Sequence, residues 1–129
     1  MKIIVLKFGG TSVGSIDRIK KVSSIIVGYR KKNYKVIVVS SAMSGVTNEL
    51  IAKSKKLSSN FPSSEYDVLV SSGEQISCSL IAGRLNELGY KSQSWMGWQL
   101  PIVTDGDYKS SRIKYIEKKK ILKFIKSGG

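Results

Sequence analysis

Two short, uninterrupted apolar runs flank one amphipathic segment, and this arrangement constrains the fold of the 129-residue chain more than any other feature. The runs, at residues 3–6 and 36–39, are typical of strands buried on both faces, as in a parallel sheet. Between them, apolar residues recur every three or four positions from about 16 to 31, which predicts a helix capped by Ser15. The pattern therefore predicts a βαβ unit, whose crossover is almost always right-handed.

The rest of the chain continues the alternation less regularly. Helices are predicted over 49–57, 65–70 and 74–87, with a pause at 71–73 between the last two and a C-terminal cap at Gly89. Short strands are predicted near 91–95 and 102–104, and a basic helix from about 118 to 126. These elements predict the α/β class, either as a small sheet or as a piece of a larger doubly wound domain.

Composition excludes several kinds of site. The chain has one cysteine, Cys78, and no histidine, which excludes an internal disulfide, Cys/His zinc sites and His-dependent nucleophilic catalysis. We expect Cys78 to be a core residue. The first apolar run is too short for a signal peptide, and no apolar stretch is long enough for a membrane span. We therefore expect a cytoplasmic protein with no membrane partner.

The net charge of +13 raises the question of nucleic-acid binding. Eight basic residues and one acid lie between Lys109 and Lys126. Most basic residues of the chain are lysines, and no aromatic residues alternate with them as a stacking platform would require. The charge pattern favours solvated helix faces over a nucleic-acid site.

Glycine, serine and threonine gather at three predicted strand-to-helix junctions, residues 7–15, 40–48 and 71–74. Ligands of open α/β sheets bind at the carboxyl ends of the strands, where helix N-termini favour anions. Gly9 and Gly10 would let a phosphate approach the backbone, and Lys7 would add a positive charge; a tight turn without a ligand accounts for the glycines equally well. The Walker A and dinucleotide-binding patterns both fail, because Ser15 replaces the required lysine and Thr11 the required glycine.

For three polar residues at these junctions, a structural role at a helix end is a simpler interpretation than substrate binding. Glu74 is predicted to open a helix, where an acid is common, although it could also accept a hydrogen bond from a substrate amine or hydroxyl. Thr47 and Asn48 are first interpreted as N-caps of the second helix.

Four segments, in chain order, carry a more specific signal. They are Lys7-Phe8-Gly9-Gly10-Thr11-Ser12-Val13-Gly14, Ser41-Ala42-Met43-Ser44-Gly45-Val46-Thr47-Asn48, Ser71-Ser72-Gly73-Glu74-Gln75 and Ile102-Val103-Thr104-Asp105. Together they resemble the aspartate kinases of the amino-acid kinase family. The resemblance implies an open, mostly parallel sheet with helices on both faces. It also implies transfer of the γ-phosphoryl group of ATP, supplied with Mg²⁺, to the side-chain carboxylate of L-aspartate, the first step toward lysine, threonine and methionine.

The resemblance also implies roles for individual residues. Lys7 would neutralise the transferring phosphoryl group, and the ATP phosphates would be bound by Lys7, Phe8, Gly9, Gly10 and Ser41. Of these, Lys7, Gly9, Gly10 and Ser41 would be catalytic. Thr47, Asn48 and Glu74 would bind aspartate, with Glu74 receiving the α-ammonium group. No protein-bound metal is expected.

Members of this family are much longer, so we expect residues 1–129 to be the N-terminal portion of a catalytic domain. The remainder of the nucleotide site and the regulatory ACT domains would be absent, and the isolated chain would be inactive. The full-length form is expected to be a homo-oligomer. Two alternatives remain: another kinase of the same fold, acting on glutamate, acetylglutamate, carbamate or UMP, and a non-catalytic basic binding module.

Overall fold

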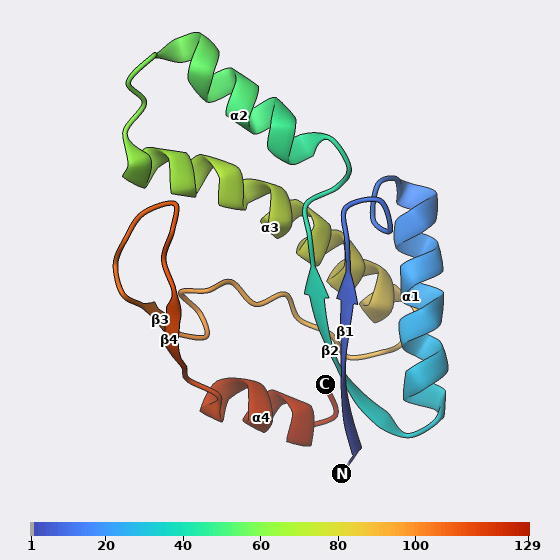
Figure 1. The fold of residues 1–129 in the computed structure, drawn as a ribbon. Coiled ribbons are helices and arrows are strands. Elements are labelled where there is room, and N and C mark those ends of the chain that lie inside the picture. The colour runs from blue at the N-terminus through green and yellow to red at the C-terminus, as the bar shows by residue number, and fades with distance from the viewer. Residues whose placement is uncertain (1) are drawn as a thin grey trace.

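A computed structural model describes residues 2–129 of the chain (Figure 1). Its elements follow one another in the order β1 (Lys2–Phe8), α1 (Ile16–Lys31), β2 (Tyr34–Ser40), α2 (Val46–Leu57), α3 (Ser63–Glu87), β3 (Ile102–Thr104), β4 (Ile113–Ile116) and α4 (Lys119–Lys126). Among residues 2–129, no helix is both long enough and apolar enough to span a membrane.

The predicted βαβ unit is confirmed. Strands β1 and β2 pair in parallel, from Lys2 opposite Tyr34 to Phe8 opposite Ser40, and α1 connects them. Because parallel strands point the same way, Phe8 and Ser40 end side by side at one edge of the sheet (Figure 1). That edge is where the first two glycine- and serine-rich segments begin.

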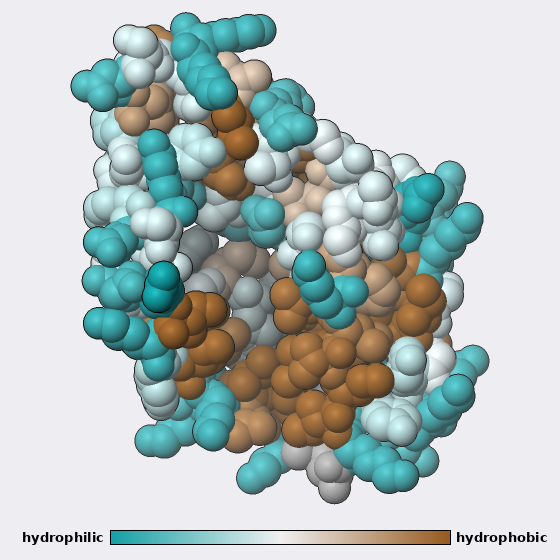
Figure 2. Space-filling view, in the orientation of Figure 1, coloured by the Kyte–Doolittle hydropathy of each residue, from teal (hydrophilic) through white to brown (hydrophobic). Residues whose placement is uncertain are grey.

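Only one face of β1 and β2 is covered within residues 2–129, which corrects the prediction of strands buried on both faces. Side chains alternate along a strand, so Leu6 and Val38 pack against the core formed with α1 and α3. On the opposite face, Val5 is 61% exposed and Val39 is 49% exposed. Figure 2 shows this apolar surface beside a hollow of about 610 Å³, whose lining comes mainly from β2, α3, residues 90–102 and α4.

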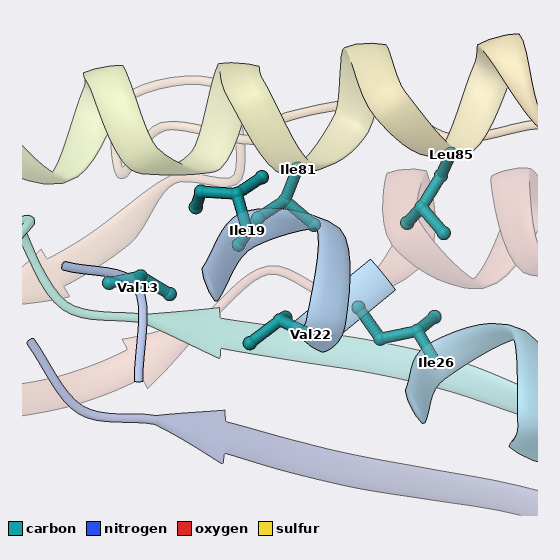
Figure 3. Packing of buried hydrophobic residues seen from close by; sticks show 6 residues of the cluster. All are labelled: Val13, Ile19, Val22, Ile26, Ile81 and Leu85. Atoms are coloured by element: carbon teal, nitrogen blue, oxygen red, sulfur yellow. The ribbon is translucent and has the colours of Figure 1, made fainter. Parts of the chain in front are cut away.

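The buried core lies between α1, α3 and the covered face of the sheet (Figure 3). Its apolar side chains recur at helical spacing on both helices, and burial of each stabilises the fold by roughly 1.5–3 kcal/mol. They are Val13, Ile19, Val22, Ile26, Ile81 and Leu85. Val13 belongs to the loop after β1, so the core also anchors that loop.

Helix α3 is continuous for 25 residues, and the predicted pause at 71–73 is wrong. The hydroxyl groups of Ser71 and Ser72 donate to the carbonyl oxygens of Val68 and Leu69, which satisfies the two serines inside the helix. Gly73 is helical as well, and the neighbouring loop packs tightly against it. Tertiary contacts therefore override the weak helix propensity of this segment.

The C-terminal region differs from the prediction in two places. Residues 91–95 form no strand; the side chain of Asn86 instead bonds the backbone N–H and carbonyl groups of Ser92. The predicted strand at 102–104 is confirmed as β3, but it pairs antiparallel with β4, which was not predicted. The loop joining them docks on α3, where the N–H of Lys109 donates to Asp67 at 3.1 Å. The predicted basic helix is confirmed as α4.

Candidate functional site

The carboxyl-end edge of β1 and β2 brings together two loops and the middle of α3. The first loop (residues 9–15) follows β1, and the second (residues 41–45) follows β2. The side chains of Glu74 and Ser77 on α3 form hydrogen bonds with the backbone of the second loop. Two of the three predicted strand-to-helix junctions are therefore confirmed. The third is wrong, because residues 71–74 lie inside α3.

The first loop is a succession of tight turns. The N–H of Ser12 donates to the carbonyl of Gly9 at 2.9 Å, and that of Val13 to the carbonyl of Gly10 at 3.3 Å. The preceding N–H groups, those of Gly9, Gly10 and Thr11, donate to no acceptor within residues 2–129. Consecutive backbone N–H groups of this kind can bind an anion.

The two glycines at the start of this loop differ in their surroundings. A Cβ on Gly10 would lie 3.1 Å from the carbonyl oxygen of Ala42, so Gly10 is needed for the two loops to pack. Gly14 is similar, with Ser44 Cβ 3.1 Å from its Cβ position. Gly9 has no neighbouring atom of the described residues 2–129 within 4 Å of its Cβ position. The open side of Gly9 is thus where a ligand can approach the backbone.

Lys7 and Phe8 point to opposite faces of the sheet. Lys7 is exposed on the open face, opposite Val39, and its ammonium forms no ion pair within the described residues 2–129. The Phe8 side chain packs against the core, and its carbonyl oxygen accepts the N–H of Ser41 at 3.0 Å. Lys7 can therefore offer charge to a ligand, whereas the side chain and the carbonyl group of Phe8 are engaged within the fold.

The peptide unit between Ser41 and Ala42 is held at both of its polar groups. The carbonyl oxygen of Ser41 accepts a hydrogen bond from Ser77 Oγ at 2.7 Å. The N–H of Ala42 donates to Glu74 Oε1 at 3.2 Å. Glu74 and Ser77 both come from α3, three residues apart and hence on the same side of the helix. The hydroxyl of Ser41 itself has no hydrogen-bond partner within residues 2–129.

Glu74, predicted to open a helix, instead lies in the middle of α3. Its carboxylate is half-buried and, within residues 2–129, accepts one hydrogen bond, from the N–H of Ala42. An ionised carboxylate can accept about four hydrogen bonds. At this position the helix macrodipole does not stabilise the carboxylate, because its effect is confined to helix ends. Its remaining acceptor sites can receive an ammonium group.

The N-cap interpretation of Thr47 and Asn48 is also wrong. Gly45 occupies the cap position of α2 with a left-handed φ of 84°, and no side chain caps the helix. Thr47 and Asn48 follow Val46 in the first turn, where they expose unpaired backbone N–H groups and free side chains. Val46 Cγ1 lies 3.2 Å from the Cβ position of Gly73, so this turn sits next to the residue preceding Glu74.

Cys78 is half-buried and faces the hollow described above. Burial raises the pKa of its thiol, and the negative charge of Glu74 raises that pKa further, while a hydrogen bond with Ser77 opposes the rise. A raised pKa disfavours the thiolate, which is the form that a cysteine nucleophile requires. The expectation that Cys78 is a core residue is corrected, because it is half-buried and lies outside the buried core cluster.

One residue of the site, Ser77, was not predicted from the sequence, and the fourth segment lies where its strand was predicted. Ser77 was not singled out, although its spacing of three from Glu74 would have placed both on one side of a continuous helix. The fourth segment, residues 102–105, lies in β3 and the start of the following loop, where the Asp105 carboxylate accepts the N–H of Arg112 at 3.0 Å. Across residues 2–129, no group of three or more His, Cys, Asp or Glu side chains could hold a metal ion.

Comparison with known proteins gives a consistent result. Residues 2–128 match the model of the amino acid kinase family. The aspartokinase of Bacillus sp. (strain MGA3) is 44% identical to this chain over 128 residues, covering 99% of the chain and 31% of that protein. The aspartokinase of Rickettsia felis is 46% identical over 128 residues, covering 97% and 32%. The chain thus spans about a third of the length of these relatives.

Solved structures agree on the fold. The crystal structure of aspartate kinase from Synechocystis superimposes with a TM-score of 0.67 at 38% sequence identity, over 70% of this chain and 15% of that one. E. coli aspartokinase III, in complex with aspartate and ADP, superimposes with a TM-score of 0.80 over 99% of this chain and 39% of that one. At 20% identity the second likeness establishes the fold alone.

Proposed function

The chain belongs to the amino acid kinase family, and from that premise we propose that it forms part of an aspartate kinase. The proposed reaction transfers the γ-phosphoryl group of ATP to the side-chain carboxylate of L-aspartate. Three features that meet at the carboxyl ends of β1 and β2 carry the proposal. They are the N–H groups of Gly9 and Gly10, which are unpaired within residues 2–129, the Ser41–Ala42 peptide held by Glu74 and Ser77, and the Glu74 carboxylate. Relatives named aspartokinase, 38–46% identical to the chain, support aspartate as the acceptor.

On the phosphoryl side, the proposal uses charge and backbone donors. Gly9 and Gly10 would donate N–H groups to the phosphate oxygens, and the Lys7 ammonium would offset the negative charge of the transferring group. Ser41 would line the same site with its free hydroxyl. Such preorganised donors supply most of the catalysis in phosphoryl transfer, which demands little covalent work of the protein.

On the acceptor side, Glu74 would receive the α-ammonium group of aspartate, with Thr47 and Asn48 at the start of α2 as further ligands. The accepting carboxylate of aspartate is already ionised near neutral pH, so no general base has to create the nucleophile. A chain without histidine can therefore serve this reaction.

The resemblance to aspartate kinases also supports proposals about the metal ion, the oligomeric state and the pathway. We propose that Mg²⁺ enters bound to ATP, bridging its phosphates as is usual for this ion. We further propose that the full-length enzyme is a cytoplasmic homo-oligomer on the route to lysine, threonine and methionine.

The test is an NMR titration of the isotope-labelled 129-residue chain. Magnesium tripolyphosphate serves as the phosphate probe and L-aspartate as the acceptor probe. We expect saturable shifts of the amide signals of Gly9, Gly10 and Ser41 with tripolyphosphate, and of Thr47 and Glu74 with L-aspartate. An absence of saturable shifts at these amides would overturn the proposal, and tighter binding of L-glutamate would overturn the choice of acceptor.

Matched variants separate specific binding from general charge. Lys7→Met should weaken tripolyphosphate binding, whereas Lys35→Met, on the same sheet face but opposite Ile3 at the other end of the strands, should not. Glu74→Gln should abolish the aspartate response, whereas Glu65→Gln, in the exposed first turn of α3, should leave it unchanged.

A further inference from the structure

Ser77 is a fully buried polar residue at the centre of a small hydroxyl network. Its side chain is 0% exposed. Its Oγ lies 2.7 Å from the carbonyl oxygen of Ser41, 3.1 Å from that of Glu74 and 3.3 Å from Ser40 Oγ. Water cannot substitute for these contacts, because the group has no accessible surface.

The single proton of each hydroxyl limits how the network can be arranged. Ser77 gives its proton to the nearest acceptor, the carbonyl oxygen of Ser41. The Ser40 hydroxyl can donate either to the same carbonyl oxygen, at 3.1 Å, or to Ser77 Oγ, at 3.3 Å. The carbonyl oxygen of Ser41 is therefore within reach of both hydroxyl groups, and Ser77 is its closer donor.

These contacts fix the backbone on both sides of the Ser41 side chain. Its N–H is bound to the carbonyl oxygen of Phe8, and its carbonyl oxygen to Ser77. The next N–H, that of Ala42, is bound to Glu74. With its backbone held at each polar group, Ser41 has a fixed Cβ position at this end of the sheet, and only rotation about χ1 moves its free hydroxyl. The direction in which Cβ leaves the chain is set by the backbone.

We propose that Ser77 is a positioning residue, whose buried hydroxyl holds the carbonyl group of Ser41 and so aims the Ser41 hydroxyl at the phosphoryl group. This inference rests on the proposed function, because it assigns Ser41 to the phosphate site. Ser77 itself would touch neither substrate. Glu74, which holds the same Ser41–Ala42 peptide, would contact aspartate. This one peptide unit would therefore connect the phosphate side of the site with the aspartate side.

The experiment compares Ser77→Ala with Ser77→Thr, which keeps the hydroxyl, in the full 129-residue chain. Ser79→Ala is the matched control, since Ser79 lies on the same helix, is exposed, and within residues 2–129 donates only to the carbonyl of Ile76, at 2.8 Å. Two quantities are measured well below the unfolding temperature: the carbonyl ¹³C shift of Ser41 and the dissociation constant for magnesium tripolyphosphate.

We expect Ser77→Ala to shift the Ser41 carbonyl signal and to weaken tripolyphosphate binding about five- to tenfold, the effect of one lost hydrogen bond. Ser77→Thr should stay within about twofold of the parent chain, a margin below the typical value of a hydrogen bond, and Ser79→Ala should be unchanged. A merely structural role would lower stability without changing the dissociation constant of the folded chain.

The binding of tripolyphosphate by Ser77→Ala and by the parent chain tests two different claims. Binding by Ser77→Ala as tight as that of the parent chain overturns the positioning role and leaves the proposed function intact. Failure of the parent chain to bind tripolyphosphate overturns the proposed function and the inference with it. If Ser77→Ala does not fold, Ser77→Cys, which has nearly the same shape and a weaker donor, replaces it under the same criterion.

Discussion

The Cβ position of Gly73 on α3 lies 2.9 Å from the Cβ of Ala42 on the second loop, closer than two carbon atoms can pack. The same position is 3.2 Å from Val46 Cγ1. Helix α3 can therefore approach the loop and the start of α2 only because residue 73 has no side chain. Glu74 and Ser77 reach the Ser41–Ala42 peptide because of this close approach.

We predict that Gly73→Ala destabilises the chain by up to about 2 kcal/mol, because overpacking usually costs about 1–3 kcal/mol. The higher helix propensity of alanine offsets roughly 1 kcal/mol of that cost. Urea unfolding measures the difference. Gly83→Ala is the matched control on the same helix, since nothing lies within 4 Å of its Cβ position, and it should stabilise the chain. Equal effects at the two positions would contradict the packing argument.

Gly9 and Gly10 should respond differently to the same substitution. Gly10→Ala brings a methyl group against the carbonyl oxygen of Ala42, so it should lower stability by about 1 kcal/mol. Gly9→Ala should change stability by less than about 0.5 kcal/mol, because its Cβ would point into open space. Thermal unfolding measures stability, and titration with tripolyphosphate measures binding. Gly9→Ala should weaken that binding despite normal stability; unchanged binding would argue against a phosphate at Gly9.

Adjacent isoleucines of α1 test the assignment of the core. Ile26 is 2% exposed and packs against α3 and the sheet, whereas Ile25 is 49% exposed. Ile26→Ala should cost about 2–5 kcal/mol, and Ile25→Ala about 0.5 kcal/mol or less. Denaturant unfolding of both variants gives the comparison. A reversed order would mean that α1 is rotated about its axis relative to this structure.

Cys78 should titrate at a higher pH in the folded chain than in urea, because burial and the charge of Glu74 both raise the pKa of its thiol. The rate of alkylation by iodoacetamide as a function of pH measures this midpoint. Glu74→Gln removes the charge but keeps an acceptor for the Ala42 N–H, and it should lower the midpoint partway. Glu65→Gln is the control and should leave the midpoint unchanged.

The same shift makes stability depend on pH. The unfolded thiol has the lower pKa, so the unfolded chain releases its proton first as the pH rises. The stabilisation linked to Cys78 is therefore complete below the pKa of the unfolded thiol and is lost as the pH rises above it. A stability that increased through this alkaline range in the parent chain, but not in Cys78→Ala, would contradict the sign of the shift.

Local patterns predicted the N-terminal half of the fold well. The apolar runs of β1 and β2 and the amphipathic spacing of α1 are strong periodic signals, and the structure confirms all three elements. The predictions were wrong where distant contacts decide the outcome. Nothing near residues 71–73 indicates that Ala42 and Val46 pack on Gly73, and that contact accompanies the continuous helix.

The candidate site shows the same division. Glycine-rich loops at strand ends could be located from the sequence because they follow directly from strand and turn patterns. The role of Ser77 could not, because it depends on the distance between α3 and the second loop. Likewise, β4 has no strong alternation and is exposed throughout, so its pairing with β3 was not visible in the sequence.

The continuity of α3 has a consequence for motion. At 1.5 Å per residue the helix is about 37 Å long. Its middle forms hydrogen bonds with the Ser41–Ala42 peptide, and its later turns pack in the core through Ile81 and Leu85. Releasing the loop as a local event would require α3 to bend or to leave its packing. We therefore expect the amide of Ala42 to exchange its hydrogen with solvent almost as slowly as core amides do, as one cooperative unit.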